Sequence, residues 1–244
     1  MARLRVKEEP SKDEKVPAKT LATRVAEAQL RPKPKLVIQD EKVPPKPRLR
    51  VVETTIHASI DIGSVNFCIC IQRRTPRDGK TDRVRIVLWE KWNLAQGSKC
   101  VTIAVLDRLT KQLDAILPLL QETSFFHIEK QRSLNHNAVR MEQHTLSYLL
   151  LKFPEKPRSH FFSIPSSMKY TANNCPKGLT KYKKKRWSPV KAMELLEERG
   201  DYEGIAILEE GIRIKKADDF ADAYIQIEAG CKRYVPQVEG GELS

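Results

Sequence analysis

The order of apolar runs after residue 55 limits the fold of this chain more than any other feature of its sequence. Residues 56–62, 65–72 and 84–89 form three runs that are rich in β-branched side chains, which favour strands. A turn sequence at residues 76–79 (Pro-Arg-Asp-Gly) separates the second run from the third. The folded part is therefore expected to open with three strands in hairpin succession.

Further along the chain, the spacing of apolar residues becomes helical. They recur every three or four positions in two long stretches, and each stretch is followed by a short apolar run. The expected elements are a helix over 105–120, a strand over 125–129, a helix over 135–153, a strand over 160–164, a helix that starts at Ser188-Pro189 and a last helix over 217–233. The order βββαβαβα predicts an α/β fold, a mixed five-stranded sheet with helices packed on it.

The first 55 residues differ in composition from the rest of the chain. They hold seven of the 15 prolines, no glycine and no aromatic residue, with 14 basic and eight acidic side chains. Such a segment cannot bury enough apolar surface to offset the entropy of ordering. Residues 1–55 are expected to be a disordered basic tail, either a spacer or a DNA-tethering arm. Residues 56–235 are the expected folded domain, and 236–244 a flexible C-terminus.

Positive charge is concentrated in two parts of the sequence. The formal net charge is +13, of which the tail carries +6. Residues 156–193 contain ten Lys and Arg and no acid, so the remainder of the chain is slightly acidic. Clustered basic side chains bind nucleic acid effectively because they release its counterions. We expect nucleic acid as the partner and no membrane, since no apolar run is long enough to cross one.

The five cysteines are too few and too scattered for a disulfide framework. Cys68 and Cys70 lie two apart in a strand-like run, and no further Cys or His follows at metal-binding spacing. They are interpreted as buried thiols in a reducing compartment, which predicts an intracellular protein that is not secreted.

Four carboxylates fall at positions where an acid is costly unless it is paired or binds a cation. Asp61 ends the first expected strand and Glu129 ends the fourth. Asp219 and Asp222 are three apart on the last helix and therefore share a face, while Asp218 is adjacent and competes for the role of Asp219. If the first and fourth strands are neighbours under the last helix, these acids converge.

Converging carboxylates make a site for a hard cation, Mg²⁺ or its substitute Mn²⁺. Two such ions can activate water and stabilise the leaving oxygen of a phosphodiester. The sequence has no Walker-type glycine loop, no nucleophile elbow and no His-rich zinc motif. It therefore predicts a metal-dependent nuclease that needs no small-molecule cofactor.

Three segments carry a family resemblance: 61–66 (Asp-Ile-Gly-Ser-Val-Asn), 128–131 (Ile-Glu-Lys-Gln) and 216–223 (Lys-Ala-Asp-Asp-Phe-Ala-Asp-Ala). They resemble the RuvC-type Holliday junction resolvases, in the branch shared by large DNA viruses, such as poxviruses and iridoviruses, and by fungal mitochondria. The resemblance covers about residues 56–233 and implies a ribonuclease-H-like fold.

The resemblance also implies a function. A resolvase of this kind is a homodimer that binds a four-way DNA junction and cuts two opposed strands symmetrically. Its catalytic metal ligands would be Asp61, Glu129, Asp219 and Asp222, with Asp218 as the alternative to Asp219. Two ions per active site are implied as well. An assisting lysine is expected between the fifth strand and the last helix, and residues 183–186 (Lys-Lys-Lys-Arg) offer candidates.

The basic segment supplies most of the expected DNA contacts. These are Gln131, Arg132, Lys169, Lys181, Lys183, Lys184, Lys185 and Arg186. Residues 183–186 also fit a nuclear-import patch, so a viral replication site in the cytoplasm or in the nucleus is compatible with the sequence. Two other functions stay open, a related nuclease for RNA–DNA hybrid or flap DNA and a nonenzymatic basic DNA-binding protein.

Overall fold

The computed structural model describes residues 53–77 and 80–236. These residues form a five-stranded sheet in the order β3-β2-β1-β4-β5. Strands β1, β2 and β3 pair antiparallel, whereas β4 pairs parallel to β1 and to β5. The mixed five-stranded sheet expected from the sequence is confirmed. Its strands are β1 (Thr55–Asp61), β2 (Phe67–Arg77), β3 (Lys80–Trp92), β4 (Phe125–Lys130) and β5 (Phe161–Pro165).

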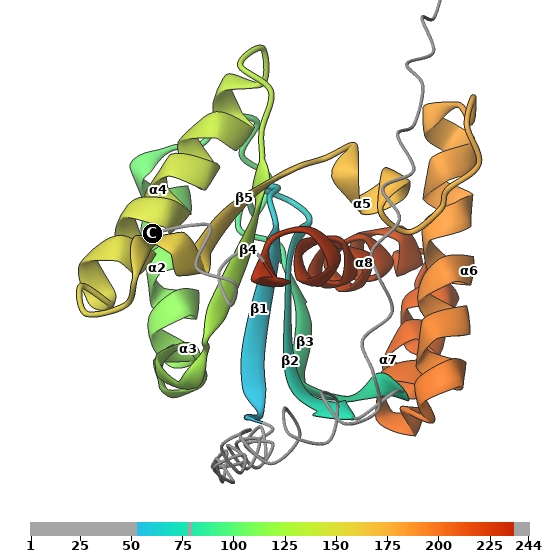
Figure 1. Cartoon of the computed structure of the whole chain (residues 1–244). Coiled ribbons are helices and arrows are strands. Elements are labelled where there is room, and N and C mark those ends of the chain that lie inside the picture. The colour runs from blue at the N-terminus through green and yellow to red at the C-terminus, as the bar shows by residue number, and fades with distance from the viewer. Residues whose placement is uncertain (1–52, 78–79, 237–244) are drawn as a thin grey trace, which may run out of the picture. The chain divides into compact units, whose positions relative to one another are not determined.

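Helices cover both faces of this sheet (Figure 1). On one face lie α2, α3 and α4, and on the other α8 crosses the strands, with α6 and α7 packed outside it (Figure 1). The helices are α2 (Ile103–Ala115), α3 (Leu117–Glu122), α4 (His136–Lys152), α5 (Met168–Thr171), α6 (Lys181–Arg199), α7 (Tyr202–Arg213) and α8 (Ala217–Arg233). The result is an α/β fold with the sheet in the middle.

Alternation along the strands decides which side chains face α8. In β1, Ala58 and Ile60 belong to the apolar core shared with α2 and α4. The residues between and beside them project to the opposite face, because successive side chains of a strand point to opposite sides. His57 on that face contacts Cys231 of α8. By the same alternation Asp61, four residues after His57, lies on the α8 side of the sheet.

Helix α8 is fixed on the sheet by a buried amide. Gln226 is fully buried, and its Nε2 donates to the carbonyl oxygens of Ile60 at 3.1 Å and of His127 at 2.9 Å. These two carbonyls belong to the neighbouring parallel strands β1 and β4. One side chain therefore ties the helix to the pair of strands whose ends carry Asp61 and Glu129.

The region between β5 and α8 differs from the expectation. The predicted helix start at Ser188-Pro189 is wrong: α6 begins at Lys181, where the Thr180 side chain caps it by accepting from Lys183 N at 3.3 Å. Pro189 lies inside the helix and lacks an N–H for the preceding turn. Helix α7 follows, and the sequence analysis does not predict it.

The single helix predicted over 105–120 is two helices, α2 and α3. Pro118 lies in the first turn of α3, where proline is tolerated. The same proline disfavours a helical conformation in the residue before it, so α2 ends just upstream. The predicted tail falls, apart from its last three residues, outside the described residues, and so does nearly all of the predicted C-terminus. Both stay predictions. Within the part of the chain that the structure describes, no helix has the length and apolar character needed to cross a lipid bilayer.

Candidate metal centre and nucleic-acid interface

Three of the predicted acids meet around one buried lysine. The Nζ atom of Lys169 lies 3.0 Å from Asp61 Oδ1, 3.1 Å from Glu129 Oε1 and 3.0 Å from Asp222 Oδ2. The Lys169 side chain is only 3% exposed. An ammonium group has three protons, and here each has a carboxylate oxygen within reach. The sequence predicted Lys169 as a DNA contact, whereas the structure places it among the acids.

Each member of this acid cluster comes from a different element. Asp61 is the last residue of β1 and Glu129 the fifth of the six residues of β4, so both lie where neighbouring parallel strands end. Asp222 lies on α8, which crosses above them. The short helix α5 supplies Lys169, and it is tied to α8 by Asn173, whose Nδ2 donates to Lys169 O at 2.7 Å and to Ile225 O at 2.8 Å.

The other two acids of α8 lie apart from Lys169. Asp219 is buried and lies 3.8 Å from the ammonium of Lys91 on β3. Asp218 points toward Lys185 of α6, at 2.6 Å, and is more exposed. Asp219 lies one turn before Asp222 on the helix, and its ion pair with Lys91 is long, whereas Asp218 is in close contact with Lys185. This arrangement favours Asp219 over Asp218 as a further ligand.

Burial and crowding shift the pKa values of the cluster. Burial raises the pKa of Asp61 well above its usual value, and Glu129 and Asp222 add to the rise against the opposing effect of Lys169. Burial pushes the pKa of Glu129 upward too, but Lys169 and hydrogen bonds outweigh it, so this pKa is lowered. The three acids raise the pKa of Lys169 despite its burial, so its ammonium stays charged at neutral pH.

The acid cluster fits a hard divalent cation. Every candidate ligand atom is a carboxylate oxygen, the donor type that Mg²⁺ and Mn²⁺ prefer. Among the described residues, Asp222 Oδ1 and Asp219 Oδ2 are buried and lack a hydrogen-bond donor. Three acids also share a single ammonium, which leaves negative charge uncompensated in a buried place. Buried oxygens without a hydrogen-bond donor and excess negative charge are what a bound cation would relieve.

A cleft of about 490 Å³ opens over the acid cluster. Its floor includes Glu129, Lys169 and Asp222, and its walls are mainly basic and polar. The remaining lining residues are Lys130, Gln131, Arg132, Asn135, Ser166, Ser167, Tyr170, Lys181, Lys184 and Lys185. An acidic floor under basic walls is an arrangement that can hold a phosphate strand against a cation.

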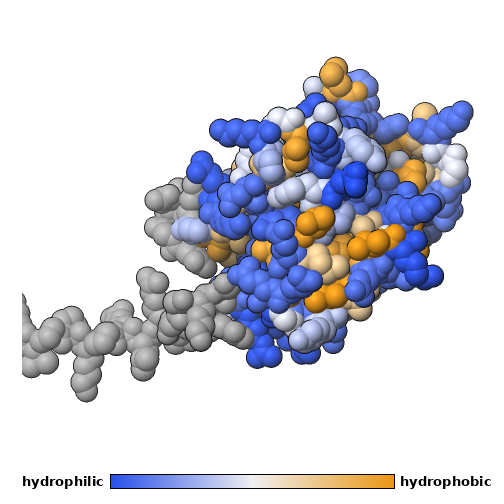
Figure 2. Space-filling model, turned by 90° about the vertical axis from the view of Figure 1, so that its right-hand side faces the viewer, coloured by the Kyte–Doolittle hydropathy of each residue, from blue (hydrophilic) through white to orange (hydrophobic). Residues whose placement is uncertain are grey.

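The predicted DNA-contacting residues of α6 fall into two groups. Lys181, Lys184 and Lys185 line the cleft, and Lys184 Nζ lies 5.1 Å from the centre of the Tyr170 ring. Lys183 and Arg186 are exposed on the same helix but do not line the cleft. The side of the molecule that carries α6 and α7 is mostly hydrophilic, with small hydrophobic areas (Figure 2).

Gln131 and Arg132, which follow β4, behave differently from each other. Gln131 Nε2 donates to Glu129 Oε2 at 2.6 Å, and its backbone N–H donates to the buried Glu142 at 2.8 Å. Gln131 therefore orients a cluster carboxylate as well as lining the cleft. Arg132 is exposed at the cleft wall, where a DNA contact was expected.

Tyr170 is a cluster neighbour whose role the sequence reasoning missed. The sequence presents it as one ring among lysines, suited to stacking on bases. In the structure its hydroxyl donates to Asp222 Oδ2 at 3.3 Å. Lys91 and Glu142 were missed as well, because no local pattern marks a strand lysine or a helix glutamate as a neighbour of distant acids.

Comparison with solved structures identifies the fold. The Holliday junction resolvase of yeast mitochondria is 20% identical in sequence and superimposes with a TM-score of 0.52, over 77% of this chain and 81% of that one. This chain has the fold of that resolvase. RuvC of Thermus thermophilus is 12% identical over 73% of this chain and 96% of its own, with a TM-score of 0.49. The fowlpox virus Holliday junction resolvase is 16% identical over 73% and 98%, with a TM-score of 0.45.

The resolvase fold agrees with the resemblance seen in the sequence, and it is a ribonuclease-H-like fold, as predicted. The three segments that carry the resemblance lie at the end of β1, at the end of β4 and in the first half of α8. In the folded chain, each of these segments contributes one carboxylate to the acid cluster around Lys169. No protein-family model matches the sequence, and none of the curated proteins is similar enough to it to be matched.

Proposed function

We propose that this chain is a structure-selective DNA endonuclease that resolves four-way junctions by metal-dependent hydrolysis of phosphodiester bonds. The single observation that carries the proposal is the position of the acid cluster. Three carboxylates from three elements point at one place on the floor of a cleft whose walls carry Lys181, Lys184 and Lys185. Acids repel phosphate unless a cation neutralises them, so acids under a basic cleft favour metal-dependent phosphodiester chemistry.

The metal-binding residues of the proposal are Asp61, Glu129 and Asp222, with Asp219 as the fourth ligand. A divalent cation bound there, Mg²⁺ or Mn²⁺ and in the two-ion form of the reaction a pair of them, supplies an activated water and stabilises the leaving oxygen. Gln131 orients Glu129 through its 2.6 Å hydrogen bond, and the 3.3 Å hydrogen bond from the Tyr170 hydroxyl orients Asp222.

Lys169 has a separate role in the proposal. Its ammonium holds the three carboxylates together while no divalent cation is bound, which lowers their mutual repulsion. It also lines the cleft, where its ammonium would be placed to contact a phosphate group of bound DNA. Lys169, and not one of residues 183–186, is then the assisting lysine between the fifth strand and the last helix.

Selectivity for a junction rests on the fold and on the three resemblance segments. A solved structure with this fold and a TM-score of 0.52 is a Holliday junction resolvase. Two cuts in opposed strands require two active sites, so we propose a homodimer as the active form. Five free cysteines fit work in a reducing compartment, which includes the sites where viral or cellular DNA is replicated.

Incubation of the full chain with end-labelled synthetic four-way junctions and Mg²⁺, read on a denaturing gel, tests the proposal. We expect paired symmetric nicks with wild-type protein and none with Asp61→Asn or Glu129→Gln. Both variants should still bind the junction in a gel shift, because the basic cleft walls are unchanged. The control is Asp218→Asn, which alters an acid of α8 that is paired with Lys185.

Three results would contradict the proposal. Normal cutting by Asp61→Asn would remove the metal assignment. Preferential cutting of RNA–DNA hybrid over a junction of equal length would replace the substrate while keeping the chemistry. Junction binding without any cutting, unaffected by chelator, would leave a nonenzymatic DNA-binding protein.

A further inference from the structure

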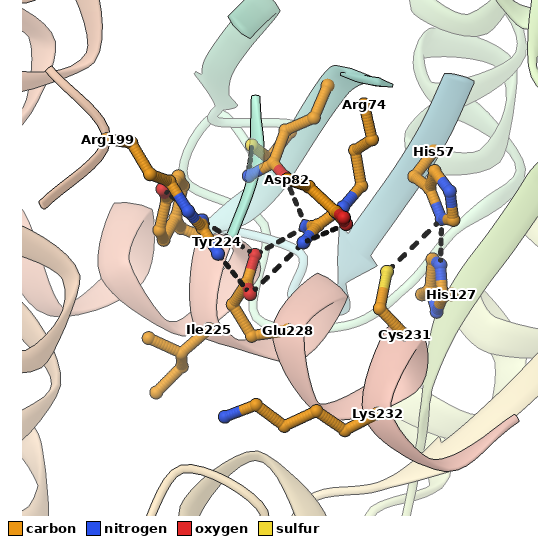
Figure 3. A network of polar contacts seen from close by, with 12 residues as sticks. His57, Arg74, Asp82, His127, Arg199, Tyr224, Ile225, Glu228, Cys231 and Lys232 are labelled. Atoms are coloured by element: carbon orange, nitrogen blue, oxygen red, sulfur yellow. Dashed lines mark hydrogen bonds and ion pairs between the residues drawn. The ribbon is translucent and has the colours of Figure 1, made fainter. Parts of the chain in front are cut away.

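A second group of metal-ligating side chains lies under the other half of α8. His57 of β1, His127 of β4 and Cys231 of α8 bring their ligand atoms within 4.8 Å of one another. His57 Nδ1 lies 3.0 Å from His127 Nε2 and 3.4 Å from Cys231 Sγ. Figure 3 shows the two rings and the sulfur facing one another. Both histidines are buried, and Cys231 is partly buried.

The separations of these atoms match those of a coordination shell. With metal–nitrogen bonds of about 2.0 Å and metal–sulfur bonds of about 2.3 Å in a tetrahedral site, two nitrogens lie roughly 3.3 Å apart and nitrogen and sulfur roughly 3.5 Å apart. Two of the three separations, 3.0 Å and 3.4 Å, differ from these by a few tenths of an ångström, and the third lies within 4.8 Å. Small side-chain movements would be enough to admit an ion.

The chemistry of this second group differs from that of the acid cluster. Imidazole nitrogen and thiolate sulfur are ligands for Zn²⁺ or Cu⁺, whereas Mg²⁺ and Mn²⁺ prefer oxygen. A neutral imidazole keeps one nitrogen lone pair for a metal. The two groups would therefore select different ions.

Neighbouring residues hold the ligand atoms in place. Thr55 Oγ1 lies 2.9 Å from His57 Nε2, so the second ring nitrogen of His57 has a hydrogen-bond partner and Nδ1 is left to face the centre. Gly230 lies against the His127 ring so closely that any side chain there would collide with it. All five histidines and all five cysteines of the sequence are among the described residues, so no further ligand of these two types lies outside them.

We infer that His57, His127 and Cys231 form a binding site for one thiophilic metal ion, Zn²⁺ or Cu⁺. Binding forms two metal–nitrogen bonds and one metal–sulfur bond, and the thiol proton of Cys231 is released to solvent. The site joins α8 to β1 and β4, the same three elements that carry Asp222, Asp61 and Glu129. It would fix the helix over the strands independently of any nuclease activity.

Metal binding to the full chain tests this inference with defined ions. Purified protein is stripped with chelator, then titrated separately with Zn²⁺ and with Cu⁺ against a chromophoric chelator. We expect one ion per chain for the favoured metal, and with Co²⁺ as a probe a thiolate-to-cobalt charge-transfer band. Cys231→Ser should remove the band and lower the affinity on the order of a hundredfold, as loss of a ligand does.

Three controls separate this site from others. Cys175→Ser changes another partly exposed cysteine and should leave binding unchanged. Asp222→Asn alters the acid cluster and should also bind the thiophilic ion normally. If Cys231→Ser does not fold, X-ray absorption of the zinc-loaded or copper-loaded wild type must show nitrogen and sulfur ligands. A shell of oxygen atoms alone, no bound ion, or unchanged affinity in a folded Cys231→Ser would overturn the inference.

Discussion

The two halves of α8 each carry an acid that contacts cations, Asp222 partly buried and Glu228 almost fully buried, but the balance of charge is opposite. Near its N-terminal end, Asp222 shares a single ammonium with two other acids. Near its C-terminal end, Glu228 alone receives two guanidinium groups, Arg74 at 2.6 Å and Arg199 at 2.6 Å, which reach it from different directions (Figure 3).

The two acids also differ in how fully their oxygens are hydrogen-bonded. Glu228 accepts hydrogen bonds on both oxygens, and the two guanidinium groups lower its pKa although burial raises it. Asp222 has an oxygen without a donor among the described residues and lies on the floor of a cleft. Charge is therefore at least partly buried at both ends, whereas only the first has negative charge left over and a cleft beside it. We interpret the first as a ligand site and the second as a structural clamp.

The largest expected effect is the loss of cleavage in Asp222→Asn. Removal of a metal ligand should slow junction cutting on the order of a thousandfold. Stability should be unchanged or slightly higher, because fewer acids then share the ammonium of Lys169. Single-turnover cleavage and urea unfolding measure the two effects. A stable variant that cuts normally, or a variant that fails only because it unfolds, would break the contrast with Glu228.

Glu228→Gln should have the opposite profile. It leaves two buried guanidinium groups without their shared acid, so the free energy of unfolding should fall by about 3–5 kcal/mol. The fraction that remains folded should cut junctions at the wild-type rate, since Glu228 lies outside the cleft lining. Urea unfolding and cleavage at low temperature test this, and Glu210→Gln, at an exposed ion pair with Arg213, is the control with little effect.

Lys169→Met tests whether the Lys169 ammonium stabilises the acid cluster in place of a divalent cation. Without divalent ions the melting temperature should fall, because three carboxylates lose their shared ammonium. Added Mn²⁺ should then raise the melting temperature more than in wild type and bind on the order of tenfold more tightly, since no built-in cation competes. Lys183→Met, which changes an exposed lysine outside the cleft, serves as the control. Equal Mn²⁺ affinity in Lys169→Met and wild type would contradict the proposed role.

A smaller effect is expected from the basic residues of α6. The double variant Lys181→Ala with Lys184→Ala removes two cleft lysines and should weaken junction binding several-fold. It should also reduce the slope of log affinity against log salt by about two. Lys183→Ala with Arg186→Ala removes the same charge from outside the cleft. If both double variants lower affinity equally, the cleft walls are not the DNA-binding surface.

The strands and the acids could be predicted because local patterns mark them. Strand ends at Asp61 and Glu129 stand out as acids beside apolar runs, and alternation with the parallel pairing of β1 and β4 then brings them to one place. The helix that carries Asp222 is marked by its position after the basic segment and by its spacing. The order of the elements predicted the mixed sheet, whereas the pairing of β1 with β4 was only a condition and comes from the structure.

The central lysine could not be predicted, because its role depends on where the chain returns in space. Lys169 stands among many basic residues, and only the tie between α5 and α8 by Asn173 places its ammonium at the acids. Helix α7 was not predicted, although Asp201 caps it. The Ser188-Pro189 pair suggested a helix start at a position that lies inside α6. Buried polar partners such as Gln226 leave no mark in the local pattern.

Binding of Mn²⁺ to the full chain without DNA, monitored by electron paramagnetic resonance, tests directly whether the acid cluster is a metal site. Wild type and Asp218→Asn are expected to bind Mn²⁺ alike, whereas Asp61→Asn and Asp222→Asn should lose this binding while remaining folded. Wild-type affinity in Asp61→Asn and Asp222→Asn, or loss of binding in Asp218→Asn alone, would contradict this assignment.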